Sequence, residues 1–241
     1  MILDITRMLF GNLSGNSTDG FSLIIKFLSR VFVIFCTMPI HEYAHARVAT
    51  WLGDKTPKLS GRLTINPLAH ISPIGAVMIF LCGFGYAKPV NVNPRNFKNP
   101  KLGMALTAVA GPVSNLIIGF IFMLSSIMMS KIFTINSPSI SYAIFYFFYF
   151  ASIININLAV FNLLPIPPLD GSRVLQLLIP TKHYYKFLQY ERYITIVVFI
   201  LIMTGILSGP LSAISNVVSG LFEIVANIIC NIILFGYNLI F

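Results

Sequence analysis

The segment FSLIIKFLSRVFVIFCTMPIHEYAHARVATWL, residues 21–52, combines two features that decide how the chain folds. It is largely apolar and long enough to cross the hydrocarbon core of a bilayer as a helix, which takes about 20 residues. It also contains the pattern HExxH, as HEYAH at residues 41–45. Ionisable side chains in a membrane helix are costly, by about 2.5–3.5 kcal/mol on insertion scales, so this segment predicts a functional site inside a membrane span.

The composition of the whole chain indicates an integral membrane protein. Of its 241 residues 56% are hydrophobic and 10% are charged, whereas a soluble domain carries about 25% charged residues. This excludes a disordered protein, a coiled coil and a small disulfide-stabilised secreted domain. The 16 Lys and Arg exceed the 7 Asp and Glu, an excess typical of the cytoplasmic loops of membrane proteins. We therefore expect the lipid bilayer, and no nucleic acid, as a partner.

Uncharged or nearly uncharged stretches predict the other spanning helices. They lie at residues 102–130, 140–164, 193–222 (interrupted by Ser208-Gly209-Pro210) and 211–241. Together with residues 21–52, they predict an all-α polytopic membrane protein with about five to six transmembrane helices.

The region 53–101 differs from these spans because it is rich in Gly, Pro and Asn. Its apolar part, residues 74–86, is too short to span a bilayer and favours a re-entrant or interfacial element. Residues 61–65 and 88–92 alternate between polar and apolar side chains, as short strands do. We expect a small membrane-embedded β or re-entrant element between the first two core helices.

Charge predicts the orientation of the chain. If residues 74–86 do not cross the membrane, the loops 53–101 and 165–192 lie on the same side. These two loops hold 11 of the 16 basic residues, which places them in the cytoplasm. They are Lys55, Lys58, Arg62, Lys88, Arg95, Lys98, Lys101, Arg173, Lys182, Lys186 and Arg192.

The HExxH pattern carries explicit chemistry. His41 and His45 are four residues apart and share one face of a helix, so both imidazoles can bind one zinc ion. Glu42 stands beside that face and can take a proton from zinc-bound water. Pro39 precedes the motif and predicts a loosened or kinked helix there. The alternative is chance packing in a helix seam, which would leave these polar groups hard to satisfy without an ion.

A catalytic zinc ion takes a third protein ligand and keeps one position open. Asp170 follows the span 140–164 and lies at the same membrane side as the motif. Pro165, Pro167 and Pro168 forbid a regular helix before it, so we expect a rigid extended chain that fixes its carboxylate. A simple interfacial turn is the alternative interpretation, and Glu223 is the second choice of ligand. The full set of candidates is Asp54, His70, Asp170, His183, Glu191 and Glu223.

Three motifs in three successive spans give the chain a family resemblance. They are HEYAH at 41–45, AGPVSN at 110–115 and NLLPIPPLDG at 162–171. Over roughly residues 30–180 the chain resembles the site-2 protease family of intramembrane zinc metalloproteases. The stretches 61–70 and 87–90 are similar to its compact prokaryotic branch, which lacks PDZ and CBS domains. Ser72 departs from that branch, where Asp is expected, and this puts any role of His70 in doubt.

The resemblance implies a site and a reaction. It implies that His41, His45 and Asp170 bind one Zn2+ per chain and that Glu42 is the catalytic base. It also implies that Asn162 steadies the substrate carbonyl or its oxyanion. The substrate would be a transmembrane protein or peptide, which the β element presents as an added strand. Such regulated intramembrane proteolysis cuts within or near transmembrane segments, in a multi-pass protein of the cell membrane whose active site faces the cytoplasm.

We accordingly expect a polar N-terminal segment at 1–20, a catalytic transmembrane core at 21–180 and C-terminal transmembrane helices at 181–241. A competing function is a metal-ion transporter or channel that uses the His, Glu and Asp cluster. It would need a second polar site along the membrane normal, which residues 102–130 and 193–222 do not supply. A catalytically inactive scaffold is a third class, against which the intact Glu42 argues. The sequence leaves open the roles of His70, Asn115 and Glu223 and the oligomeric state.

Overall fold

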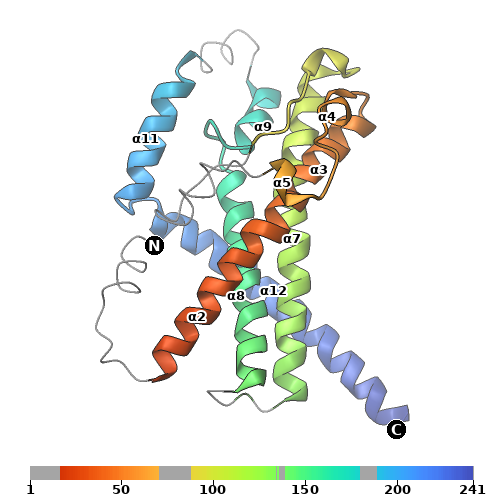
Figure 1. Cartoon of the computed structure of the whole chain (residues 1–241), viewed down its shortest axis with the longest axis vertical. Helices are drawn as coiled ribbons and strands as arrows, with labels where there is room; N and C mark the ends of the chain where they lie inside the picture. Colours follow the sequence, from red (N-terminus) through yellow and green to blue (C-terminus); the bar gives the residue numbers. More distant parts are fainter. Residues whose placement is uncertain (1–16, 71–87, 134, 136–138, 180–188, 241) are drawn as a thin grey trace.

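The computed structural model of the chain describes residues 17–70, 88–133, 135, 139–179 and 189–240 (Figure 1). Within these ranges the protein is helical, with turns and extended connections and no strand. Most of the N-terminal segment 1–20 lies outside them. The helices in chain order are α2 (Ser17–Phe32), η1 (Val33–Thr37), α3 (Met38–Trp51), α4 (Thr56–Leu59), α5 (Pro67–His70), η2 (Pro94–Asn96), α7 (Pro100–Ile132), α8 (Ile140–Asn162), α9 (Gly171–Leu178), α11 (Glu191–Met203) and α12 (Ser208–Ile240).

Four helices of the described chain are long and apolar enough to cross a membrane, which makes the protein a multi-pass membrane protein. They are Gly20–Trp51, Pro100–Ile132, Ile140–Asn162 and Gly209–Gly236. The expected span at 193–222 is not one helix. A turn at residues 204–207 separates the 13-residue α11 from α12, and 13 residues are fewer than the roughly 20 that a bilayer requires. Ser208-Gly209-Pro210 does not interrupt this region but begins α12, because proline is tolerated in the first turn of a helix.

The strands expected at 61–65 and 88–92 are not present. Residues 61–65 form turns, and residues 88–92 run without regular structure. The Nε2 atom of His70 lies 2.7 Å from the Thr64 carbonyl oxygen, and the Lys88 amide donates to the His70 carbonyl at 2.6 Å. A strand needs a continuous ladder with a neighbour, and the described residues supply only such isolated bonds. Residues 74–86, the centre of the expected β or re-entrant element, lie outside the described residues.

The first span is one long helix with an altered segment in the middle. Pro39 lies in the first turn of α3 and has no N–H to donate to the preceding turn. Immediately before α3, residues Val33–Thr37 adopt a π-helix, a form often found at functional sites. This confirms the prediction that the helix loosens ahead of the motif. The helix ends at Trp51, and Gly53 then turns the chain with a φ of 111°, a conformation that side chains disfavour.

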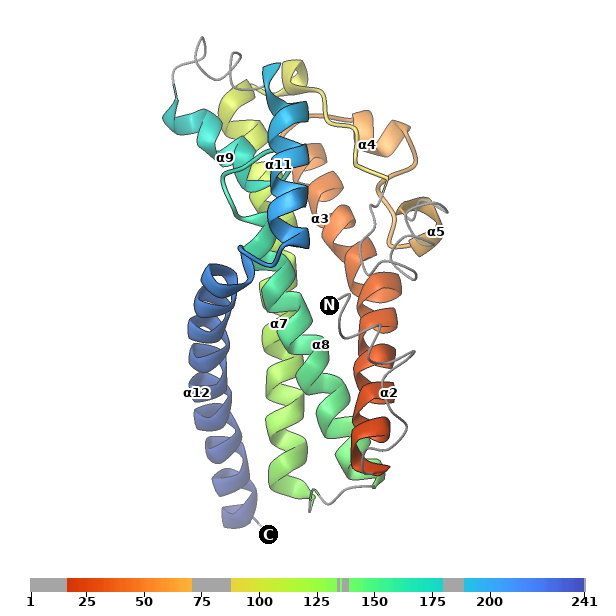
Figure 2. The ribbon, with the colours of Figure 1, turned by 90° about the vertical axis from the view of Figure 1, so that its left-hand side faces the viewer.

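The helices α7 and α8 form the centre of the molecule, with α2 and α3 on one side and α12 on the other (Figure 2). Interhelical hydrogen bonds support this packing, since lipid provides no hydrophobic drive for it. The Ser152 hydroxyl donates to the Gly119 carbonyl at 2.7 Å, and the Ser29 hydroxyl donates to the Phe147 carbonyl at 3.1 Å. At one end of the molecule α3, α4, α5 and α9 gather around the first half of α7 (Figure 1), and this end holds the HExxH motif.

Candidate metal centre

Three side chains from two distant parts of the sequence converge where α3 crosses α7. The Nε2 atoms of His41 and His45 lie 3.0 Å apart, and each lies 3.3 Å from the same carboxylate oxygen of Asp170. Both histidines are buried, with 3% and 8% exposure. The three ligand atoms therefore face one another in a space that bulk water does not fill.

The helix α3 places the two histidines together, as their spacing predicts. Their rings lie edge to face, with centroids 4.7 Å apart and an interplanar angle of 85°. This arrangement directs both Nε2 atoms to the same point. Glu42, the next residue along α3, is half-buried beside them.

The tautomer of His45 is fixed by helix α7. Its Nδ1 atom lies 2.7 Å from the Thr107 carbonyl oxygen. A carbonyl oxygen only accepts hydrogen bonds, so Nδ1 carries the proton and Nε2 keeps its lone pair toward His41 and Asp170. A histidine ligand to a metal ion usually has such a partner on its other nitrogen. No sequence signal pointed to Thr107, because the bond uses a backbone carbonyl that every residue has.

Gly111 forms the floor of the site on helix α7. A Cβ atom added at this position would overlap the Nε2 atoms of both His41 and His45. Gly111 belongs to the AGPVSN stretch at 110–115, and the atoms that approach it are the Nε2 atoms of the two histidines. The glycine thus leaves room for an ion and a further ligand.

Asp170 reaches the histidines from the segment that follows α8. The prolines prevent a helix there, as predicted, but residues 163–170 form successive turns and not an extended chain. The turns follow because amides in this segment still donate locally, for example from Leu169 to the Ile166 carbonyl at 2.9 Å. Gly171 lets the segment fold back, since a Cβ there would overlap the carbonyl oxygens of Leu163 and Leu164.

The carboxylate of Asp170 is directed at the histidines and not at its own backbone. Asp170 occupies the N-cap position of α9, yet its side chain makes no capping hydrogen bond. One oxygen of this carboxylate, Oδ2, lies 3.3 Å from the Nε2 atoms of both histidines. A carboxylate oxygen beside two imidazole nitrogens is a set of atoms that zinc binds.

These residues fit a zinc ion. Zinc takes imidazole nitrogens and carboxylate oxygens at about 2.0–2.2 Å in tetrahedral geometry, so its ligand atoms lie roughly 3.3 Å apart. The observed separations of 3.0 and 3.3 Å match this spacing. Two imidazoles and one carboxylate, beside a glycine that adds no side chain, leave a position free for water, as in catalytic zinc sites.

Comparisons with known proteins agree with this site. The chain is 41% identical over 174 residues to the "Putative zinc metalloprotease YwhC" of Bacillus subtilis, a match that covers 72% of this chain and 80% of that protein. The model of Peptidase family M50 matches residues 125–205. The chain belongs to peptidase family M50. It is a membrane zinc metalloprotease of this site-2 protease family, which confirms the resemblance, the enzyme class and the cofactor predicted from the sequence.

The M50 family match includes Asp170, whereas the HExxH motif at 41–45 precedes the matched residues. The chain is also 28% identical over 153 residues to the zinc metalloprotease MJ0392 of Methanocaldococcus jannaschii. That match covers 64% of this chain and 35% of the longer relative. No solved structure matches the chain.

The other candidate ligands of the M50 protease that the structure describes lie outside this cluster. Asp54 is buried and accepts hydrogen bonds from Thr56, Asn93 and Asn96, which tie the loop after α3 to the segment before α7. His70 bonds within its own loop, through Thr64. His183 lies outside the described residues. In the described part of the chain only His41, His45 and Asp170 form a group of three metal-binding side chains.

Two asparagines singled out in the sequence have no hydrogen bond to the site among the described residues. Asn162 is the last residue of α8 and is half-buried. Asn115 lies one helical turn beyond Gly111 on α7, so it shares the face that meets the histidines. It is fully buried, and neither its amide nitrogen nor its oxygen has a hydrogen-bond partner there.

Proposed function

We propose that this M50 protease hydrolyses peptide bonds within or next to transmembrane segments of other membrane proteins. The convergence of His41, His45 and Asp170 below the loop end of the bundle supports this proposal. Gly111 lies 11 residues from the start of α7, which is about 16 Å along the helix axis. A peptide bond must therefore enter the membrane region of the protein to reach these side chains.

In this proposal His41, His45 and Asp170 hold one zinc ion per chain. When bound, the ion supplies a Lewis acid that polarises the scissile carbonyl and lowers the pKa of water toward about 7. Glu42 accepts the proton of the attacking water as its oxygen bonds to the carbonyl carbon. Glu42 then delivers this proton to the leaving amine as the C–N bond breaks. The position of Glu42 next to His41 on α3 supports this role.

We assign Asn162 to the substrate carbonyl oxygen. Its side-chain amide would donate a hydrogen bond to this oxygen as negative charge develops on it. The residue ends α8 just before the turns that carry Asp170. The same short segment of chain would thereby supply one zinc ligand and one donor to the substrate.

The substrate is a membrane protein whose transmembrane helix unwinds locally. A peptide bond in a helix is enclosed by its own hydrogen bonds, and in lipid no water replaces them. We propose that the region 53–101 enters the membrane as a re-entrant element and aligns the unwound chain. The catalytic core is then residues 21–180, flanked by the segment 1–20 and by the helices of residues 181–241.

The orientation follows from the loops around the site. The loop end of the bundle carries most of the basic residues of the chain, which supports a cytoplasmic location for it. Water would then reach Glu42 from the cytoplasm. We further propose that α11 and the first turns of α12 form a fifth, broken crossing, since α11 is apolar but only 13 residues long.

The experiment that tests this function pairs zinc content with cleavage. Wild type and Glu42→Gln, purified in detergent, are assayed for bound metal and for cutting of labelled single-span peptides. We expect about one zinc per chain in both, with cleavage at least about 100-fold slower in Glu42→Gln because a general base contributes that much or more. Glu191→Gln, which removes a carboxylate outside the cluster, should cut normally. Undiminished cleavage by Glu42→Gln would refute the mechanism.

A further inference from the structure

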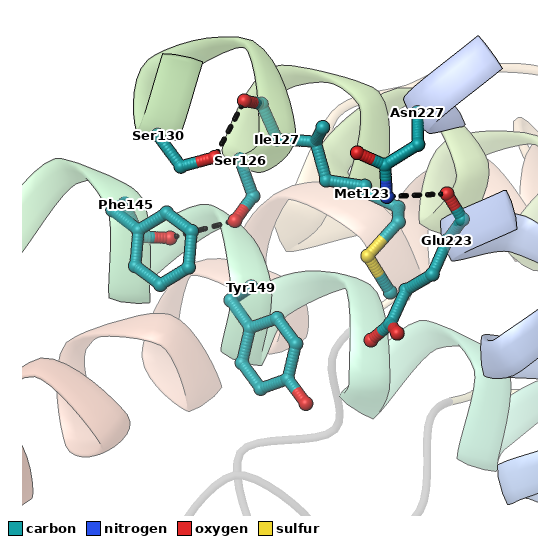
Figure 3. Close-up of a pocket in the computed structure, with 8 residues that line it drawn as sticks. All are labelled: Met123, Ser126, Ile127, Ser130, Phe145, Tyr149, Glu223 and Asn227. Carbon is teal, nitrogen blue, oxygen red and sulfur yellow. Dashed lines mark hydrogen bonds between the residues drawn. The ribbon is translucent and has the colours of Figure 1, made fainter. Parts of the chain in front are cut away.

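A polar cavity lies between α7, α8 and α12 (Figure 3). Its volume is about 210 Å³, and its polar lining comes from Ser126, Ser130, Tyr149, Glu223 and Asn227. Ser126 follows Gly111 by 15 residues on α7, which separates the cavity from the metal centre by about 22 Å along that helix. The cavity therefore belongs to the opposite half of the membrane, and peptide hydrolysis does not use it.

Hydrogen bonds to the backbone fix the chemical character of this cavity (Figure 3). The hydroxyls of Ser126 and Ser130 donate to the carbonyls of Phe145 and Ile127, at 3.2 and 2.8 Å. Each hydroxyl has one proton, so only oxygen lone pairs of these serines remain available. The amide nitrogen of Asn227 donates one of its two protons to the backbone carbonyl of Glu223 at 2.9 Å, and the amide oxygen of Asn227 is a further acceptor.

Glu223 adds a carboxylate to these acceptors. It lies near the middle of the candidate span Gly209–Gly236 and is half-buried. None of the basic side chains in the described ranges forms an ion pair with it. The nearest candidate on the facing helix, Lys131, instead donates to Asn231 at 2.9 Å, two turns further along α12. Acids inside membrane spans are costly and normally pair with a positive group.

We propose that this cavity binds the side chain of a Lys or Arg carried by a transmembrane helix of a partner membrane protein. An ammonium or guanidinium group offers three or five N–H donors and no acceptor, which complements the oxygens around Glu223. The cavity is several times larger than the roughly 30 Å³ that one water occupies, so it has room for a side chain. This site is independent of the proposed proteolysis.

The surface next to the cavity is suited to a neighbouring helix. Asn227, which lines the cavity, is exposed, and around the helix it lies between Glu223 and the apolar Ile224 and Ile228, which are 59% and 53% exposed. A partner helix that packs on Ile224 and Ile228 and passes over Asn227 can extend one basic residue into the cavity. Apolar packing would then supply contact area, and Glu223 would select partners with a positive charge at its own depth.

The test uses the full-length protein in phosphatidylcholine vesicles with synthetic Leu/Ala single-span peptides. One peptide series carries a single Lys, moved turn by turn along the helix, and the control peptide has Leu there. Association is measured by energy transfer between labelled protein and labelled peptide. We expect one Lys position to strengthen association about ten-fold over Leu, in line with the measured strength of polar pairs between membrane helices.

Three variants test whether Glu223 causes the preference for the Lys peptide. Glu223→Gln should abolish the preference for Lys, whereas Glu191→Gln should keep it. Glu223→Lys should prefer a peptide with Glu at the same position, which also shows that loss of binding is not loss of folding. Equal association of the Lys and Leu peptides with wild type would overturn the proposal, and so would a Lys preference that survives Glu223→Gln. Self-association of the protein that depends on Glu223 without any peptide would also overturn it, in favour of a second copy.

Discussion

Asp170 and Glu223 are two membrane-region carboxylates that the protein surrounds in different ways. One oxygen of Asp170 lies 3.3 Å from the Nε2 atoms of both His41 and His45. The polar groups that line the cavity with Glu223 are hydroxyls and an amide, and no ion pair joins Glu223 to a basic residue of the described chain. The first carboxylate belongs to a ligand set that the chain completes by itself, whereas the second needs a positive group from outside.

Asp54 provides a third case, in which a carboxylate has a structural role. It is fully buried, and the hydroxyl and amide donors of Thr56, Asn93 and Asn96 lie 2.5–3.0 Å from its two oxygens. Its hydrogen-bonding capacity is used within the loop, and nothing is left for an ion or a partner. The hydrogen-bonding groups around a carboxylate therefore distinguish three roles more reliably than its place in the sequence. Asp170 is a metal ligand, Glu223 a proposed docking group and Asp54 a structural residue of its loop.

The largest effect on this comparison should come from Gly111→Ala. The added methyl group overlaps the Nε2 atoms of His41 and His45, so we expect zinc affinity to fall by at least about 100-fold, beyond the usual effect of changes behind a ligand. Zinc titration in detergent measures this. Gly220→Ala on α12 is the matched control, because no atom lies within 4 Å of the position its methyl would take. Normal zinc binding by Gly111→Ala would show that α7 does not form one wall of the metal site.

A smaller effect, on the free energy of unfolding, should distinguish Asp54 from Glu223. Asp54→Ala removes the four hydrogen bonds that the buried carboxylate accepts, so we expect the free energy of unfolding to fall by about 2–3 kcal/mol. Glu223→Gln should change it much less, because Glu223 has no charged partner within the described chain. Unfolding in a denaturing detergent, followed by circular dichroism, compares the two. Equal losses would mean that Glu223 is a structural residue as well.

The contribution of Asp54 should also depend on pH. Burial raises the pKa of Asp54, but hydrogen bonds from Thr56, Asn96 and the Asn93 amide hold it below its usual value. A lowered pKa adds stability that is complete above the unfolded-state pKa of about 3.9 and is lost as the pH falls through the lower folded-state pKa. Proteolytic nicking at residues 53–60 should therefore increase below about pH 4 in wild type. Asp54→Ala should be nicked to the same extent below and above about pH 4.

Much of the metal centre could be predicted from the sequence, and the reason is local. The two histidines lie on one helix, where a spacing of four fixes their geometry, and the proline-rich stretch before Asp170 limits the chain to a few conformations. The turns at 163–170 were not predictable as such, because prolines forbid a helix without selecting between extended chain and turns. The contact between His45 and the Thr107 carbonyl could not be predicted either, because every residue type has a backbone carbonyl.

Some of the spanning helices were predicted correctly from the sequence and others were not. Apolar length identifies α7 and α8, because nothing in their sequences competes with a helix. It does not locate the turn at 204–207, where Gly205 adopts a φ of 75°. Met203, Ile206 and Leu207 around it are apolar, and the apparent breaker Pro210 lies in the first turn of α12. The pairing of Glu223 with a cavity was also outside the reach of sequence, since it depends on where α12 meets α7 and α8.

The smallest effect should come from the contact that holds α7 and α8 together between the two carboxylate sites. Ser152→Ala removes the hydrogen bond to the Gly119 carbonyl, and such bonds are worth about 0.6 kcal/mol in membrane proteins. We expect the free energy of unfolding to fall by that amount, while zinc content and binding of the Lys peptide stay unchanged. A loss of zinc in Ser152→Ala would indicate that the two halves of the bundle are coupled.

The most direct test of the account compares the two carboxylates in one assay. Asp170→Ala and Glu223→Ala are purified alongside wild type, and bound zinc per chain is measured after dialysis against a weak chelator. We predict that Asp170→Ala loses the metal, whereas Glu223→Ala retains about one zinc per chain, because only Asp170 lies with His41 and His45. Zinc retained in Asp170→Ala, or lost in Glu223→Ala, would contradict the assignment of the metal centre.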